Sequence, residues 1–228
     1  MPLDNDRYLS LIARAAADFS FYKGTIQDLS RNQRPMSFVG SPSFSKCNGL
    51  PCLKQNAAGD YTTSAAIPAV LDVTASWSIE ALFSPGPGTI ATILQQVGAA
   101  NAGGFSFQWR NTGGDVDVIL VYLFDLAAGP RLLYSNNGVF TRYSTRHAII
   151  SGINGGASGK MWLNGVPIVC NLFGAAAPAN IAVNRALTTL VGPVITTASL
   201  IRVYPFALTN EDASCLYQQA KILTGGDV

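Results

Sequence analysis

Paired carboxylates are the side chains through which this chain could hydrolyse a glycan. Such hydrolysis needs two carboxyl groups about 5–10 Å apart, and the nearest candidates are Asp115 and Asp117. They share one face of a strand start and directly follow Gly113 and Gly114. This position is typical of a solvated strand end. We therefore expect a non-enzymatic protein with no catalytic residues and no cofactor.

The single histidine and the four cysteines give no metal or nucleophile motif. Zinc sites cluster their Cys and His ligands, whereas only Cys47 and Cys52 are close in the sequence. These two flank a tight turn and could form a small disulfide loop, but four cysteines allow three full pairings and the sequence does not choose among them. We expect Cys170 and Cys215 to be small buried hydrophobic residues and His147 to be a structural strand residue.

A sugar-binding site needs an exposed aromatic ring beside polar groups. Trp109, Arg110 and Asn111 supply these groups where a strand runs into a loop, and they are our candidate ligand-binding residues. The alternative is that Trp109 continues the core face set by Phe105 and Phe107, with which it alternates. For Trp109 itself the sequence favours this core position.

Short strands separated by turns fill the chain after Asp18. The Asn-Gly pairs at 137–138 and 164–165 favour tight hairpin turns. Many short, turn-bounded strands predict an all-β protein, an antiparallel β-sandwich or jelly roll. The strands are predicted over residues 76–83, 89–97, 104–109, 116–124, 132–134, 147–153, 160–163, 166–170, 187–191 and 199–204.

Both ends of the chain carry a short helical segment. Residues 7–17 have helical composition, with Tyr8, Leu11 and Ile12 on one apolar face. We predict an N-terminal helical arm over residues 1–17 ahead of one sandwich domain over residues 18–228. The three apolar residues are its candidate assembly contacts, because a short isolated helix is marginal in water. Near the other end, Thr209 and Asp212 have the spacing of a capping box at the start of a helix.

Four segments, in order, resemble the laminin G-like, concanavalin A-like jelly-roll family. The resemblance covers roughly residues 18–222 and implies a concanavalin A-like sandwich. The segments are Asp28–Asn32 with Val39–Phe44, then Leu71–Ala81, then Lys160–Val166, and finally Leu200–Asp212 with Leu216 and Tyr217.

Many members of that family bind calcium, and the resemblance would place Asp28 and Asn32 at such a site. Here Arg31 replaces a family glycine and Arg34 follows, and two cations disfavour a divalent ion. We expect no metal, and we expect Asp28 to accept backbone N–H bonds in a structural turn instead.

The amino-acid composition argues against several classes of function. Charged residues make up 12% of the chain, against about 25% in ordinary soluble domains. The net charge of +2 and the lack of a long basic run argue against nucleic acid as a partner. The apolar runs are too short to span a membrane, and the acidic N-terminus does not resemble a secretory signal.

An uncharged surface suits a protein packed against neighbours. The sequence therefore predicts a structural, self-associating protein, a bacteriophage virion component such as a capsid decoration (cement) protein. Its partners would be other virion proteins, and it would be assembled in the host cytoplasm. The alternative is a carbohydrate-binding, lectin-like module with a glycan partner.

Overall fold

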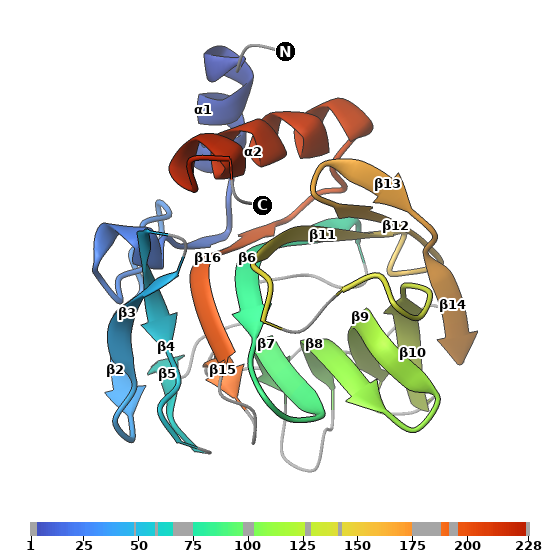
Figure 1. The fold of residues 1–228 in the computed structure, drawn as a ribbon. Helices are drawn as coiled ribbons and strands as arrows, with labels where there is room; N and C mark the ends of the chain where they lie inside the picture. The colour runs from blue at the N-terminus through green and yellow to red at the C-terminus, as the bar shows by residue number, and fades with distance from the viewer. Residues whose placement is uncertain are drawn as a thin grey trace.

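The computed structural model describes two antiparallel β-sheets packed face to face, with two helices at one end of the molecule (Figure 1). This confirms the predicted all-β, jelly-roll-like sandwich with a short helix near each end. Leu71 to Thr74, part of one of the family-like segments, lie outside the described residues. The described residues are 4–47, 49–57, 59–65, 75–97, 103–125, 129–140, 143–174, 188–191 and 196–226.

The helical elements are α1 (Asn5–Ala13), the 3-10 turn η1 (Phe21–Lys23) and α2 (Asn210–Leu223). The strands of the first half are β1 (Ala17–Phe19), β2 (Met36–Val39), β3 (Ser43–Cys47), β4 (Leu50–Lys54), β5 (Tyr61–Ser64), β6 (Trp77–Pro85), β7 (Ile90–Val97) and β8 (Gly104–Thr112). Those of the second half are β9 (Asp115–Asp125), β10 (Gly129–Tyr134), β11 (Arg146–Ile153), β12 (Ser158–Leu163), β13 (Val166–Ile168), β14 (Asn171–Gly174), β15 (Thr188–Val191) and β16 (Thr196–Tyr204).

Each of the two sheets has eight strands among the described residues. Sheet A has the strand order β13-β12-β11-β6-β16-β4-β3, and β1 pairs with β16 beside β4. Sheet B has the order β14-β10-β9-β8-β7-β15-β5-β2. Neighbours in space are often far apart in sequence, since β6 lies between β11 and β16. The longest strands of sheet B, β8 and β9, form a hairpin at its centre.

Aromatic rings fill the space between the sheets. Phe83 of sheet A stacks on Phe140 with ring centroids 4.6 Å apart and meets Phe107 of sheet B edge to face at 6.0 Å. Trp77 and Trp109 are also fully buried in this core. These five aromatic side chains hold the two sheets together, because large aromatic side chains dominate the apolar area that a core removes from water.

The helices cover the outer face of sheet A. Leu11 of α1 and Leu216 of α2 form a second apolar cluster with Trp162 and Tyr204 of the sheet. As a result β6 is buried on both faces, with Glu80 fully buried. Residues 76–81 alternate apolar and polar side chains, a pattern typical of a half-buried strand. Both faces are nevertheless buried, because the helices cover the polar face.

The ends of the helices follow the local sequence. The predicted capping box is confirmed: the Thr209 hydroxyl accepts from Asp212 N, and the Asp212 carboxylate accepts from Thr209 N. Helix α1 is shorter than predicted, because Ala17 already pairs with Val203 in sheet A. Asp4 caps its start by accepting from the backbone N–H of Arg7 at 3.0 Å.

One of the two Asn-Gly hairpins is confirmed. Asn164 and Gly165 have φ angles of 51° and 73° and join β12 to β13. Asn137 and Gly138 form a turn but no hairpin. Asn137 Oδ1 and the Gly138 N–H are hydrogen-bonded to the backbone of Val116 instead, so this turn is fastened to the start of β9.

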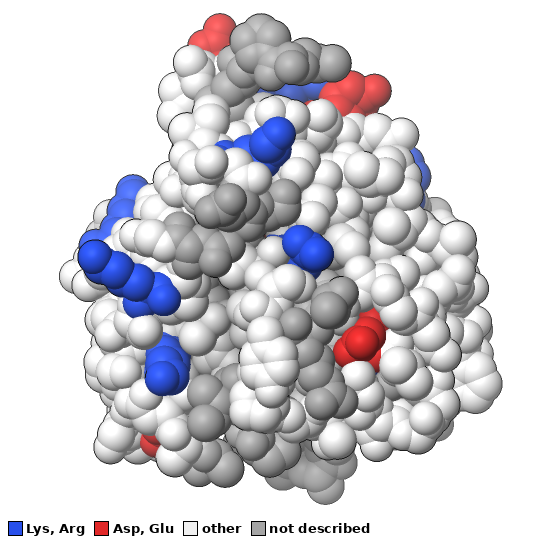
Figure 2. All heavy atoms as spheres, viewed as in Figure 1, with Lys and Arg blue, Asp and Glu red and all other residues white. Residues whose placement is uncertain are grey.

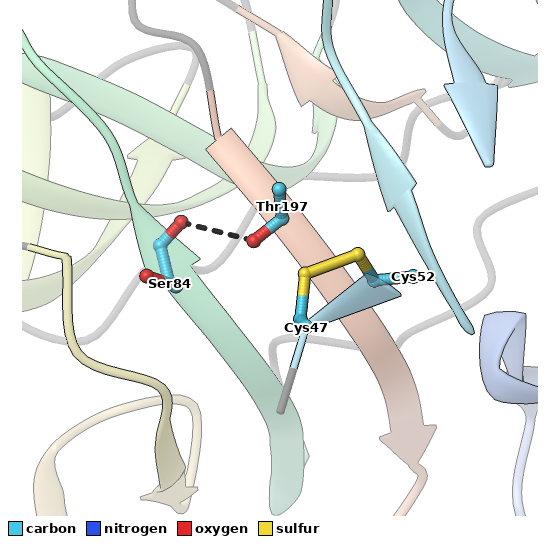
Figure 3. Close-up of a disulfide and its surroundings, with 4 residues drawn as sticks. All are labelled: Cys47, Cys52, Ser84 and Thr197. Atoms are coloured by element: carbon cyan, nitrogen blue, oxygen red, sulfur yellow. Dashed lines mark hydrogen bonds between the residues drawn. A yellow bond between two sulfur atoms is a disulfide. The ribbon is translucent and has the colours of Figure 1, made fainter. Parts of the chain in front are cut away.

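A disulfide joins Cys47 and Cys52 across the β3–β4 hairpin (Figure 3). The bridge lies near β16, where Thr197 Oγ1 donates to the Ser84 carbonyl at 3.5 Å. Cys215 is buried, as expected. Cys170 is only half-buried, which corrects the expectation of full burial, because it lies between the short strands β13 and β14 at the margin of the core.

Candidate functional site

A groove lies on the outer face of sheet B, over β7, β8 and β9. It has a volume of about 270 Å³ and is lined by Gln95, Ser106, Gln108, Arg110, Tyr122 and Phe124. The alternation of β8 produces it: every second side chain of a strand points to the same face, so the odd-numbered aromatic residues enter the core and the even-numbered polar residues face outward. In the cross-strand register, Ser106 lies opposite both Gln95 and Tyr122.

The groove contains a layered aromatic and cationic surface. The Tyr122 and Phe124 rings are nearly parallel, at 10°, with centroids 5.6 Å apart. The guanidinium carbon of Arg110 lies 4.7 Å from the Tyr122 ring centroid. Both contacts are favourable, the first by ring stacking and the second by attraction of the cation to the ring face. They favour the observed orientations of Arg110 and Tyr122.

A chain of side-chain hydrogen bonds runs along β8 in the same groove. Arg110 Nε donates to Gln108 Oε1 at 3.0 Å, and Gln108 Nε2 donates to Ser106 Oγ at 2.9 Å. Polar groups therefore lie in a row beside the stacked rings. Flat apolar faces next to oriented amide, hydroxyl and guanidinium groups match a sugar ring, which has apolar C–H faces and a hydroxyl rim. Among the residues that line the groove, none is Asp or Glu.

The fold places the three predicted ligand-binding residues in different environments. Trp109 is fully buried, and its Nε1 donates to the Phe140 carbonyl at 3.4 Å, so the core position favoured by the sequence is the observed one. Asn111 lies at the end of β8, where its Nδ2 donates to Asp117 Oδ1 at 2.6 Å. Only Arg110 lines the groove.

The remaining groove residues were missed at the sequence level. Tyr122 and Phe124 belong to the predicted strand 116–124, whose apolar residues from Val118 to Phe124 suggest burial on both faces. In fact Ile119, Val121 and Leu123 face the core, and the two aromatic residues that alternate with them face outward. The signal that could have revealed them is this alternation of aromatic and aliphatic residues.

Of the candidate acidic pair, the structure describes the side chain of Asp117. Asp117 has a φ of 51°, a left-handed conformation, and its carboxylate accepts from Asn111 within the β8–β9 hairpin. The side chain of Asp115 lies outside the described part of the structure. Asp117 is therefore a turn residue held by a local hydrogen bond.

The other concentration of ionisable groups is buried between sheet A and the helices. Glu80 accepts a hydrogen bond from Tyr204 at 2.6 Å, and its second oxygen lies 2.9 Å from His147 Nε2. Arg202 Nη1 lies 3.5 Å from Glu80, and Arg202 Nε lies 3.2 Å from Asp18. All five side chains are at least 96% buried, so this cluster is closed to any ligand.

Electrostatics within the cluster favour the ionised carboxylate. Burial alone would raise the pKa of Glu80, but the attraction of Arg202 and the hydrogen bonds from His147 and Tyr204 lower that pKa to about 2. The pKa of Tyr204 is raised by burial and by the neighbouring Glu80 charge. Since a carboxylate only accepts, the His147 Nε2 carries the shared hydrogen. His147 is thus a structural strand residue, as predicted.

The candidate assembly contacts of α1 pack within the chain. Leu11 is buried in the second apolar cluster, and Tyr8 and Ile12 pack against it partly buried. The Tyr8 hydroxyl also accepts from Arg202 Nη2 at 3.2 Å, which connects α1 to the buried ionic cluster.

The structural role expected for Asp28 is confirmed. Its Oδ1 accepts from the backbone N–H groups of Asp18 and Ser30, both at 3.0 Å, and its Oδ2 lies 2.7 Å from Arg34 Nη1. An arginine thus lies beside the carboxylate that the family resemblance would offer to calcium. The described residues contain no group of three or more His, Cys, Asp or Glu side chains suited to a metal ion.

Few charged side chains lie on the face seen in Figure 2, and Lys and Arg gather at its left, where β3 and β4 lie in Figure 1. This agrees with the low charge of the sequence. Neither helix in the described residues has the length and apolarity to cross a bilayer.

The comparisons with known proteins show structures of similar fold and no similarity in sequence to a known family or curated protein. No model of a known protein family matches the sequence, and no curated protein is similar to it in sequence. The botulinum neurotoxin serotype D binding domain has a TM-score of 0.72 at 12% identity, covering 92% of this chain and 53% of that chain. The binding domain of Paraclostridial Mosquitocidal Protein 1 has a TM-score of 0.73 at 10% identity, covering 92% and 53%.

A third similar structure contains a sugar. It is the botulinum neurotoxin serotype D ligand binding domain in complex with N-acetylneuraminic acid, with a TM-score of 0.72 at 13% identity, covering 93% of this chain and 52% of that chain. This chain spans about half the length of each of these domains. At such identities the likeness concerns the fold, and it does not establish the laminin G-like family.

Proposed function

We propose that this chain is a non-enzymatic carbohydrate-binding module and that the groove on the outer face of sheet B holds the sugar. The observation that carries the proposal is the stack of Arg110, Tyr122 and Phe124 beside the hydrogen-bonded row of Gln108 and Ser106. An aromatic surface with a few oriented polar groups is the usual composition of a small-ligand site.

Binding would use two kinds of contact. The apolar face of a pyranose ring would pack against the exposed parts of the Tyr122 and Phe124 rings, where dispersion and loss of bound water favour contact. The hydroxyl rim would then exchange hydrogen bonds with Gln95 and Gln108. Because the β8 side chains already orient one another, little side-chain entropy remains to be lost on binding.

The comparisons favour this function over the virion protein that composition suggested. The similar structures are titled as binding domains of toxins, and one holds N-acetylneuraminic acid. Nothing in the comparisons supports a bacteriophage capsid protein. The division into an arm (1–17) and a sandwich (18–228) stays a prediction, and so does the assembly role of Tyr8, Leu11 and Ile12.

A glycan array tests the proposal. The wild-type protein should bind a subset of glycans, and Tyr122→Ala should weaken that binding by about tenfold or more, since a stacked ring contributes about 1 kcal/mol beyond the area it buries. Tyr143→Ala is the matched control, because Tyr143 is 68% exposed on the β10–β11 loop and outside the groove. Equal loss in both variants, or no binding by the wild type, would contradict the proposal.

A further inference from the structure

We propose that the loop between η1 and β2 forms a second binding site, which takes the carboxylate of an acidic sugar. The loop forms an open pocket of about 400 Å³, larger than the groove on sheet B and within the range of small-ligand sites. It is lined by Gln27, Asp28, Leu29, Gln33, Arg34 and Pro35. The site shares no residue with the groove.

Arg34 is held in place by one of its three nitrogens. Nη1 donates to the Ala16 carbonyl at 2.6 Å and to Asp28 Oδ2 at 2.7 Å. Neither Nε nor Nη2 has a hydrogen-bond partner within the described part of the chain. These two nitrogens form the edge of the guanidinium that binds a carboxylate through two parallel hydrogen bonds. The side chain is 15% exposed and lines the pocket.

The charges around the pocket permit an anion. Both oxygens of Asp28 are already satisfied, Oδ1 by two backbone N–H groups and Oδ2 by Arg34. Arg31, which is exposed, adds a further positive charge, so residues 27–35 carry a net charge of +1. The same arrangement explains why the loop does not suit a cation.

Neutral groups in the pocket point to a sugar acid in place of a bare anion. The side-chain amides of Gln27 and Gln33 have no hydrogen-bond partner among the described residues, and each offers two donors and an acceptor. Gln33 has a φ of 44°, an uncommon conformation for a residue with a side chain. Leu29 and Pro35 provide apolar wall. Hydroxyl groups and ring carbons of a uronic acid would match these partners while Arg34 binds its carboxylate.

The test is a calorimetric and NMR titration of the intact protein with galacturonate, galactose, acetate and inorganic phosphate. Galacturonate should bind at least about tenfold more tightly than the other three, because it alone engages the guanidinium edge and both amides. Gln27→Glu should weaken galacturonate at least about tenfold, since it adds a carboxylate to the pocket. Gln218→Glu on α2 makes the same charge change elsewhere and should have no effect.

Replacing Arg34 itself would leave the buried Asp28 carboxylate without its ionic partner, and this could unfold the loop. The second variant is therefore Gln33→Glu, which should also weaken the binding of galacturonate. Galactose, acetate or phosphate binding as tightly as galacturonate would overturn the assignment. Absence of galacturonate binding, or equal effects of Gln27→Glu and Gln218→Glu, would overturn it as well. The NMR shifts separate the two sites, because only amide shifts within residues 27–35 report this loop, whereas shifts on β7, β8 and β9 report the groove that Tyr122→Ala tests.

Discussion

Replacing Glu80 with Gln should destabilise the protein in a pH-dependent way. Glu80 lies fully buried among Arg202, His147 and Tyr204. Glutamine keeps the shape of the side chain and removes its charge, so Asp18 would be the one ionic partner left to Arg202 among the described residues. The change therefore tests the buried ionic interaction between strands of sheet A beneath the helices, with little change in packing.

The size of the effect follows from the pKa of Glu80. That pKa falls from 4.5 to about 2 in the folded protein. Because each tenfold change in proton affinity corresponds to about 1.4 kcal/mol, ionised Glu80 stabilises the fold by about 3 kcal/mol. A depressed pKa gives stability that is fully present above pH 4.5 and is lost as the pH falls through about 2. The wild type should lose this stability over that window, and Glu80→Gln should not.

Urea unfolding followed by tryptophan fluorescence measures this directly, since the three tryptophans are buried. We expect Glu80→Gln to be about 3 kcal/mol less stable at pH 7, with the difference shrinking between pH 4.5 and 2. Glu211→Gln is the matched control, because Glu211 is exposed on α2 and should show little change at either pH. Equal stability of wild type and Glu80→Gln at pH 7, or a difference that does not change with pH, would refute the reasoning.

Two further substitutions probe the packing. Leu11→Ala should cost about 2–4 kcal/mol in unfolding free energy, since Leu11 is 3% exposed, whereas Leu9→Ala, 63% exposed on the same helix, should change it by less than about 0.5 kcal/mol. Equal effects would show that α1 is not packed as described. Gly152→Ala would place its Cβ in steric conflict with the Trp77 ring and should lower the melting temperature, with a cost of about 1–3 kcal/mol. Gly114→Ala, with open space around it, should melt near the wild type.

The β-sandwich could be predicted from the sequence because the patterns that indicate its strands and turns are local. Alternation, Asn-Gly and Gly-Pro breaks, and the Thr209 capping box each depend on a few adjacent residues, and the structure confirms the strands and the cap. Local patterns do not decide which segments pair. The dipeptide Asn137-Gly138 forms a turn without a hairpin, because it is hydrogen-bonded to the backbone of Val116, which is distant in sequence. The core position of Trp109 was also readable, from its alternation with Phe105 and Phe107.

The groove and the buried ionic cluster were harder to predict from the sequence, because they depend on which strands become neighbours in a sheet. Gln95, Ser106 and Tyr122 meet only because β7, β8 and β9 pair in one register. Glu80, Arg202 and Tyr204 likewise meet through the pairing of β6 with β16, more than a hundred residues apart. Burial of the polar face of β6 required knowing that both helices fold back over sheet A.

The most direct test of the central claim is to map where a sugar binds. A ¹⁵N-labelled sample titrated with the best ligand from the glycan array should show amide shifts concentrated on β7, β8 and β9, with the largest at Gln108, Arg110 and Tyr122. The same titration of Tyr122→Ala should need at least about tenfold more ligand to reach the same shifts. Shifts confined to sheet A or the helices, or shifts on β8 that saturate at the same ligand concentration in Tyr122→Ala, would contradict the assignment of the groove as the carbohydrate site.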